Sequence, residues 1–358
     1  METPDLTTAG ELKQMLKQML EGAGDFSRLK RIDSHLAQAL ATTAASWLDL
    51  SGVVELSETA AQYIAGYKGE SLDLSGLVEL TDGVAKFLAT YRGALYLSGL
   101  TSLSPISAKY LASHVGYLDL SGLVSITDEI VLQLSGHCGG LCLAGVTELS
   151  EQAAKGFEYH QGALELPALK SLSESAAKCL AKQDNSVLEL PGLEALSDTA
   201  AKELSAHNGF LNLSGLRELS DAAAEYLGQH EGGLDLDGIT ELTEAAVTAL
   251  SYQRGPLKLA GLGRLTDRGA EALARHKGDL DLLGLTDLSD AAAKHLLRHG
   301  DDLFVNLDGI PNSAAAILGT HPTFSKYEGA DSAGSVAMFV DGETITVVYN
   351  EEDDDETG

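Results

Sequence analysis

Side chains that could bind a partner recur between the two leucines of a repeated Leu-x-Leu-x-Gly pattern, and directly before it. They are Trp47, Asp49, Asp73, Tyr96, Tyr117, Asp119, Glu165, Glu189, Phe210, Asn212, Asp235 and Asp281. On adjacent strands about 4.8 Å apart, like charges repel, and the pattern offers no structural need for an acid there. Carboxylates beside aromatic rings are typical of protein interfaces, so the pattern predicts a face for a basic or amphipathic protein. The alternative is ordinary solvation of a repeated strand.

Histidines form a second recurring set, near the end of each expected helix. They are His114, His137, His160, His207, His230, His276 and His299. Three interpretations are open: a structural role aided by the helix dipole, a pH-sensitive surface, or a metal site. Metal ligands converge on one point, whereas residues placed once per repeat lie side by side, so the spacing favours the structural role.

Other motifs that could carry catalysis or bind metal are weak. Cys138 and Cys142 form a single C-x-x-x-C, and the segment from Asp235 to Asp237 matches only part of a calcium loop. The chain contains no G-x-S-x-G, no phosphate-binding glycine loop and no H-E-x-x-H. We therefore expect no enzyme activity, no metal and no cofactor.

The candidate side chains recur because the chain contains an internal repeat of 23 or 24 residues. Copies begin at Leu48, Leu72, Leu95, Leu118, Leu141, Leu164, Leu188, Leu211, Leu234, Leu257, Leu280 and, after a step of 25, Val305. This register also places Phe304 on the outward face. A fixed period in this range indicates stacked units that share one core.

One copy, residues 211–233, shows the expected anatomy. Alternation at Leu211 and Leu213 predicts a short strand, and Gly215 suits the bend that follows because glycine adopts angles closed to other residues. Ser220 with Asp221 marks a helix start, at which the hydroxyl caps free N–H groups and the carboxylate faces the positive end of the dipole. Each copy is therefore a strand, a bend, a short helix and a loop.

The helix-start signal recurs in nearly every copy. Its Ser or Thr residues are Ser57, Thr81, Ser104, Thr127, Ser150, Ser173, Ser197, Ser220, Thr243, Thr266 and Ser289. An acid follows each except Ser104, where Pro105 suits the first helical position. Much of the net charge of −29 therefore has a structural origin.

The combined pattern LxLxGLxxLS followed by AAxxLAxHxG resembles a leucine-rich repeat solenoid of the short bacterial type, similar to planctomycete-like and GALA-type repeats. The resemblance implies an α/β right-handed solenoid with parallel strands on a concave face, short helices on the convex face, and protein recognition as the usual task. One departure is the position that carries asparagine in that family, which holds Val53, Leu77 and their equivalents here.

Both ends are expected to be covered, because an open repeat end exposes core. We expect a helical N-terminal cap with a degenerate first repeat at 1–47, twelve repeats at 48–321, a capping β-hairpin at 322–350 and a disordered acidic tail at 351–358. The apolar stripe Leu12, Met15, Leu16, Met19 and Leu20 fits a cap or a grip on a partner.

Charge and composition limit the partners. Nucleic acid and anionic membranes need clustered Lys or Arg, which a chain of this charge does not offer. No secretory signal or membrane span is evident, and three cysteines make no disulfide framework. We expect a cytoplasmic, monomeric protein-binding scaffold; the alternative is a structural protein that assembles through its terminal caps.

Overall fold

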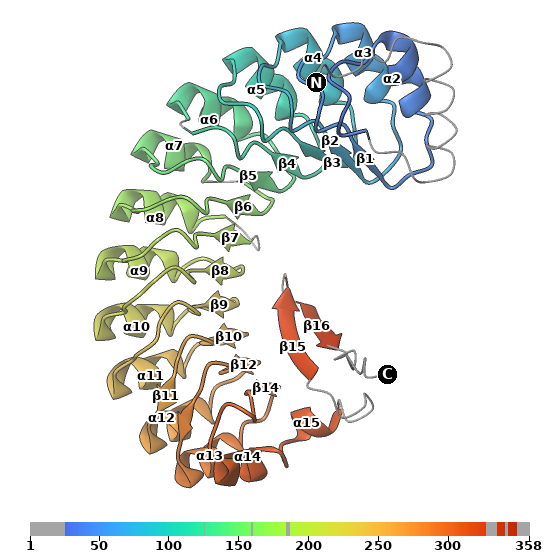
Figure 1. Cartoon of the computed structure of the whole chain (residues 1–358). Helices are drawn as coiled ribbons and strands as arrows, with labels where there is room; N and C mark the ends of the chain where they lie inside the picture. Colours follow the sequence, from blue (N-terminus) through green and yellow to red (C-terminus); the bar gives the residue numbers. More distant parts are fainter. Residues whose placement is uncertain are drawn as a thin grey trace, which may run out of the picture. The chain divides into compact units, whose positions relative to one another are not determined.

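A computed structural model describes residues 26–124, 126–158, 160–183, 187–326, 335–340 and 343–348. Within it the chain forms two compact units, and each is described by itself. The first contains residues 26–170 and 187–189, and the second contains residues 171–183 and those from 190 onward. In both, strands of two or three residues alternate with helices of six or seven in the repeats (Figure 1).

The first unit contains six described helices and seven described strands. The helices are α2 (Ser34–Leu40), α3 (Glu58–Ile64), α4 (Asp82–Leu88), α5 (Pro105–Leu111), α6 (Asp128–Leu134) and α7 (Glu151–Gly156). The strands are β1 (Trp47–Asp49), β2 (Ser71–Asp73), β3 (Ala94–Tyr96), β4 (Leu118–Asp119), β5 (Leu141–Cys142), β6 (Leu164–Glu165) and β7 (Leu188–Glu189).

The second unit continues the same alternation. Its helices are α8 (Glu174–Leu180), α9 (Asp198–Leu204), α10 (Asp221–Leu227), α11 (Glu244–Leu250), α12 (Asp267–Leu273), α13 (Asp290–Leu296), α14 (Asn312–Leu318) and α15 (Pro322–Lys326). Its strands are β8 (Leu211–Asn212), β9 (Leu234–Asp235), β10 (Leu257–Lys258), β11 (Arg264–Leu265), β12 (Leu280–Asp281), β13 (Asp287–Leu288), β14 (Leu303–Phe304), β15 (Ser335–Val340) and β16 (Glu343–Val348).

The repeat strands form one parallel sheet of twelve, in the chain order β1 to β10, then β12 and β14. Each leucine pairs with the leucine of the next copy, as Leu48 with Leu72, so residues at one repeat position share a column. The predicted α/β class, with parallel strands alternating with short helices, is confirmed. The predicted start of the last copy is wrong: Leu280 pairs with Leu303, not with Val305, so the last step from 280 to 303 is 23 residues like most of the others.

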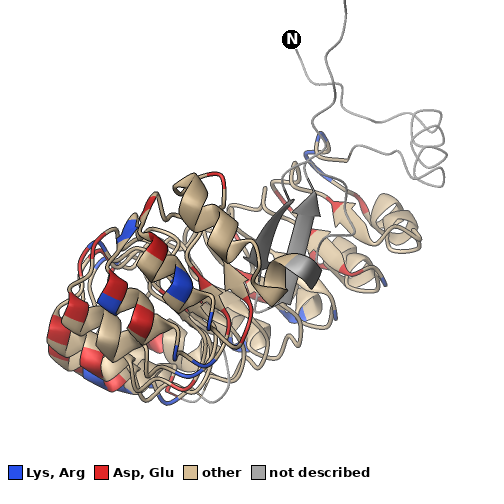
Figure 2. Ribbon diagram, turned by 90° about the horizontal axis from the view of Figure 1, so that it is seen from below, with Lys and Arg blue, Asp and Glu red and all other residues tan. Residues whose placement is uncertain are grey.

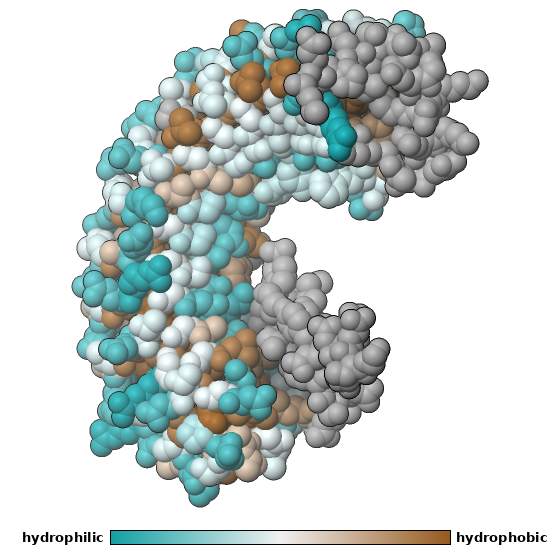
Figure 3. Space-filling view, viewed as in Figure 1, coloured by the Kyte–Doolittle hydropathy of each residue, from teal (hydrophilic) through white to brown (hydrophobic). Residues whose placement is uncertain are grey.

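The core of each repeat combines strand leucines with one narrow helix face. Leu211, Leu213, Ala223, Ala224 and Leu227 are all fully buried, as the pattern predicted. Burial of one leucine stabilises by roughly 1.5–3 kcal/mol, and helices this short depend on such packing rather than on their own propensity. Exposed large apolar side chains are scattered, and Figure 3 shows them as small separate patches.

Every predicted Ser or Thr cap is confirmed, since each hydroxyl accepts the N–H group three residues on. The acid that follows has a second role that the sequence did not reveal. The Ser104 hydroxyl donates to Asp82 of the preceding helix at 2.5 Å, and the Ser107 hydroxyl does so at 2.8 Å. The same link joins Ser150 to Asp128, and it recurs in the second unit. In Figure 2 acidic segments accordingly repeat on neighbouring helices.

A glycine follows most of the strands, with Ala168 in its place after β6, and its role differs from the one predicted. Gly215 has no positive φ; positive values occur only at Gly255 and Gly278 among the described residues. A Cβ atom at Gly215 would instead collide with the carbonyl oxygen of Pro191 in the preceding repeat. The glycine therefore permits close stacking of the bends, not an unusual backbone angle.

At the ends of the described chain, Asp33 caps α2 by accepting from the Leu36 N–H at 2.8 Å. Strands β15 and β16 pair antiparallel, with Val340 opposite Glu343 across the Asp341-Gly342 signal. The apolar stripe between Leu12 and Leu20 and the acidic tail lie outside the described residues. None of the helices described here is long and apolar enough to cross a membrane.

Candidate functional site

The acids of the strand column have a structural role. The Oδ1 atoms of Asp49, Asp73 and Asp119 accept hydrogen bonds of 2.8–2.9 Å from the N–H groups two residues further along. Asn212 accepts the same bond from Ser214 at 2.9 Å. These side chains close the turn that ends their own strand, which explains why Asp and Asn recur at this position. The prediction that no structural need exists for an acid here is wrong.

A hollow on the strand side of the first unit brings together residues from β1, β2 and β3. Trp47 is 60% exposed and lies in register with Ser71, while Asp73 lies in register with Tyr96. These four residues, with Ser46 and Glu70, line a cavity of about 380 Å³. Glu70 was not predicted, because it precedes the strand and falls outside the repeated column. Asp49 is half-buried next to Asp73.

Further along this face, aromatic and acidic side chains contact one another. The Tyr96 and Tyr117 rings lie 5.9 Å apart, and the Tyr117 hydroxyl donates to the Glu165 Oε2 atom at 3.1 Å. Burial and the nearby Glu165 raise the pKa of the Cys142 thiol to about 11. Burial likewise raises the pKa of Tyr117. Asp119 is half-buried on β4, and Glu189 is half-buried on β7.

In the second unit the same column is largely covered. Asp235 is 6% exposed, and its Oδ2 atom lies 3.6 Å from the Lys258 Nζ atom. That nitrogen also lies 5.4 Å from the centroid of the half-buried Phe210 ring, within the range of a cation–π contact. Lys258 thus contacts both the Asp235 carboxylate and the Phe210 ring within the column.

Asp281 is the most perturbed carboxyl of this column. It is 6% exposed and accepts from the Leu283 N–H at 3.0 Å. Burial, aided by the charges of Asp237 and Asp235, raises its pKa to about 6 against the opposing effects of the Leu283 N–H bond and, to a lesser extent, Lys258. The expectation of exposed side chains is wrong for Asp235 and Asp281, and also for Phe304, which is 4% exposed.

The histidines belong to a buried column that links successive turns. In its clearest cases the Tyr67 hydroxyl donates to Ala45 O at 2.7 Å, and His276 Nε2 lies 3.0 Å from Gly255 O. Consecutive rings stack with centroids 6.0–6.5 Å apart in the pairs of the column. The buried members are Tyr67, Tyr91, His114, His137, His160, Gln183, His207, His230, Gln253, His276, His299 and His321. The structural interpretation is confirmed, whereas a histidine surface is excluded by the burial.

Burial also corrects the predicted reason for these histidines. It lowers the pKa of His230 and His299, and it lowers the pKa of His276 to about 4. The rings are therefore neutral at pH 7 and gain nothing from the helix dipole as cations. The Nδ1 atoms of His230, His276 and His299 have no hydrogen-bond partner within the described chain. Among the residues described, no group of three or more His, Cys, Asp or Glu could hold a metal ion.

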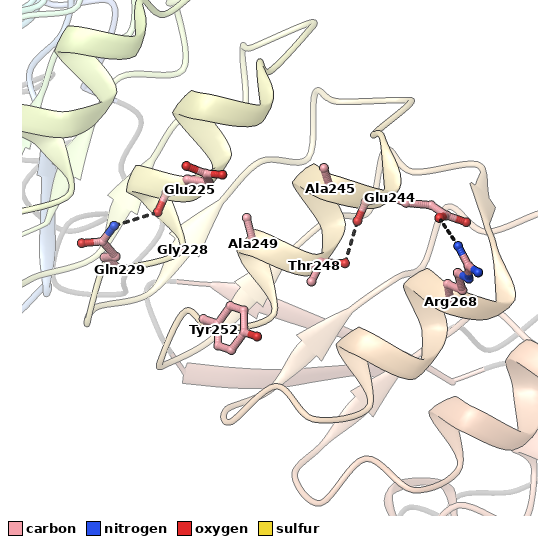
Figure 4. A pocket seen from close by; sticks show the side chains of 9 residues that line it. All are labelled: Glu225, Gly228, Gln229, Glu244, Ala245, Thr248, Ala249, Tyr252 and Arg268. Atoms are coloured by element: carbon pink, nitrogen blue, oxygen red, sulfur yellow. Dashed lines mark hydrogen bonds and ion pairs between the residues drawn. The ribbon is translucent and has the colours of Figure 1, made fainter.

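A larger hollow lies on the helix side of the second unit (Figure 4). It has a volume of about 760 Å³ and lies along α10, α11 and α12, with Ala245 and Ala249 on its floor and Tyr252 at one edge. Tyr252 is 74% exposed, and an ion pair of 3.5 Å between Arg268 and Glu244 occupies the other edge. The lining carries two carboxylates, Glu225 and Glu244, and one cation, Arg268.

No protein-family model matches this chain, and no curated protein matches its sequence. Among solved structures it is similar to an internalin (inlF) from Listeria monocytogenes, with 13% identity, a TM-score of 0.49, and coverage of 90% of this chain and 95% of that one. It is also similar to a leucine-rich repeat protein from Leptospira interrogans, with 16% identity, a TM-score of 0.34, and coverage of 90% and 99%. Likeness at this level says nothing about partner or activity.

The parallel strand ladder, its leucine-on-leucine register and the alternating helices decide the architecture. The fold is a leucine-rich repeat solenoid. In this solenoid the position occupied by asparagine in the common repeat is a buried apolar residue, such as Val53. The polar column that links neighbouring turns is made by Tyr, His and Gln instead, in the loop that follows each helix.

Proposed function

We propose that this protein is a non-catalytic protein-binding scaffold, and that the strand face of its first unit recognises a basic or amphipathic protein. The observation that carries the proposal is the exposed Trp47, with half-buried Tyr96, Asp73 and Asp119 held on neighbouring strands of that face. Aromatic anchors beside charge are the residues that contribute most to protein interfaces. The proposal includes a monomeric protein in the cytoplasm, without cofactor, nucleic acid or membrane as partner.

The choice of the first unit over the second depends on the second oxygen of each carboxylate, because Asp235 and Asp281 also close a turn with the first. The carboxylates of the first unit use one oxygen to close a turn, which fixes the side chain and leaves the other oxygen for a ligand. In the second unit Asp235 already lies beside Lys258, and Asp281 is buried. A fixed carboxylate on a rigid strand loses little conformational entropy when a partner binds.

The test removes charge from this face without removing the turn acceptor. The triple variant Asp49→Asn, Asp119→Asn and Glu165→Gln keeps an oxygen at each position, as Asn212 does naturally. Wild-type and variant proteins are immobilised, and proteins captured from the native cell are compared by quantitative mass spectrometry. We expect at least one basic protein whose capture by the variant falls about tenfold or more.

The matched control removes the same charge from elsewhere in the first unit. Glu79→Gln, Glu129→Gln and Glu148→Gln replace three exposed carboxylates outside the strand column. Capture by this control should equal that of the wild type. Equal capture by all three proteins, with folding verified by circular dichroism, would reject the strand face as the recognition surface.

A further inference from the structure

The hollow on β1, β2 and β3 has features that go beyond a generally acidic face. Its walls are two aromatic side chains, Trp47 and Tyr96, which stand on strands separated by β2. Strands two apart are about 10 Å distant, which leaves room for one planar group between aromatic side chains at van der Waals separation. Trp47 lies in register with the small Ser71 of β2 and Tyr96 with Asp73, so the two aromatic side chains stand diagonally across β2 with Asp73 beside Tyr96.

All the charged residues that line the hollow are acidic. Asp73 and Glu70 supply two carboxylates, and none of the described residues that line it is Lys, Arg or His. Asp73 is fixed by its hydrogen bond from the Ser75 N–H at 2.8 Å, and this bond uses the Oδ1 atom. Asp73, whose Oδ2 atom does not take part in that bond, and the exposed Glu70 therefore line the hollow without a cation in the same lining.

A planar cation satisfies both features together. A guanidinium group stacks on aromatic faces and donates two parallel hydrogen bonds to a carboxylate, whereas an ammonium group is a strongly hydrated point charge. We propose that this hollow binds the side chain of an arginine on the partner, with the guanidinium against Trp47 and Tyr96 and paired to Asp73. This inference rests on the proposed function, because it names the group that the strand face recognises.

The chain contains one tryptophan, so intrinsic tryptophan fluorescence reports on this hollow alone. The full-length protein is titrated with N-acetyl-arginine amide, and with the amides of N-acetyl-lysine and N-acetyl-citrulline. Citrulline keeps the shape of arginine and removes its charge. We expect a saturable change in Trp47 fluorescence with the arginine probe in the millimolar range, a weaker response to lysine, and none to citrulline.

Variants identify the groups that hold the probe. Asp73→Asn keeps the turn acceptor and should weaken the arginine probe about fivefold, as expected for a partly exposed ion pair. Glu79→Gln, the control, removes an exposed carboxylate outside the strand column and should leave the affinity unchanged. Equal responses to arginine and citrulline, or equal effects of the two variants, would overturn the inference, and lysine binding as tightly as arginine would overturn the assignment to a guanidinium.

The capture experiment and the probe titration can contradict the two proposals independently. One outcome is that capture depends on Asp49, Asp119 and Glu165 while the fluorescence of Trp47 does not respond to the arginine probe. In that case the face recognises its partner without an arginine in this hollow, and the inference is wrong. If the probe binds while capture is insensitive to those residues, the hollow is a guanidinium site and the wider recognition face is wrong.

Discussion

Replacing Asp281 with asparagine should stabilise the second unit, because the native carboxylate is ionised at an energetic cost. Burial raises the pKa of Asp281 from 3.8 to about 6. A difference of about two pH units, at 1.36 kcal/mol each, sets an upper limit of about 3 kcal/mol for the cost of ionisation at neutral pH. Asparagine removes that cost and can still accept from the Leu283 N–H, as Asn212 does for Ser214.

The gain should depend on pH in a defined direction. Because the folded pKa lies above the unfolded value, the native state binds more protons between pH 3.8 and pH 6, and wild-type stability falls as the pH rises through that window. Asp281→Asn should therefore gain about 1–3 kcal/mol at pH 7.5 and almost nothing at pH 4. The lower part of the range allows for an amide N–H₂ group that finds no partner.

Urea denaturation followed by circular dichroism, at pH 4 and pH 7.5, measures the effect as a shift of the transition midpoint in the second unit. Asp119→Asn is the control, since Asp119 closes the same kind of turn at a half-buried position of the first unit. It should change stability by less than about 0.5 kcal/mol. A gain for Asp281→Asn that is equal at both pH values, or no gain at pH 7.5, would refute the argument from buried charge.

Three further predictions follow from single contacts. Because burial lowers the pKa of His276 to about 4, the unfolded chain binds more protons below pH 6.5 and stability falls as the pH drops towards 4. His276→Gln should recover up to about 3 kcal/mol at pH 4, measured by urea midpoints against pH 7.5, where no such gain is expected. Iodoacetamide at pH 7.5 should modify the exposed Cys138 well before the buried Cys142, whose pKa is raised to about 11, as followed by peptide mass mapping; equal rates would contradict the burial. Ser104→Ala removes both the helix cap and the link to Asp82 and should cost about 1–2 kcal/mol in thermal unfolding, whereas Ser104→Thr should cost little.

The local anatomy of the repeat was predictable because each signal acts within a few residues. A hydroxyl such as Ser220 can cap only the helix that begins beside it, and the spacing of Ala223, Ala224 and Leu227 allows one buried face. The alternation of Leu211 and Leu213 likewise fixes which strand side is apolar. These elements appear in the structure where the pattern placed them.

The purpose of several recurring polar residues was not predictable, because their partners lie in the next copy or across a turn. Asp82 looks like a helix-dipole acid in sequence, yet it also accepts from Ser104 and Ser107 of the following copy, and those bonds lower its pKa. Gly215 looks like a bend residue, yet the carbonyl of Pro191 requires it. Residues separated by one period have no fixed relation in sequence until stacking sets the distance between copies.

The candidate site was likewise predictable from the sequence only in part. Sequence alone determined that acids and aromatics share one face of the strands, since register repeats with the period. Only the tertiary structure decided that Trp47 is exposed, that Glu70 lines the same hollow as Trp47, and that Asp235 and Asp281 are buried. The reason is that a repeat pattern fixes which way a side chain points relative to its own strand, whereas exposure depends on what neighbouring copies and their loops place above it.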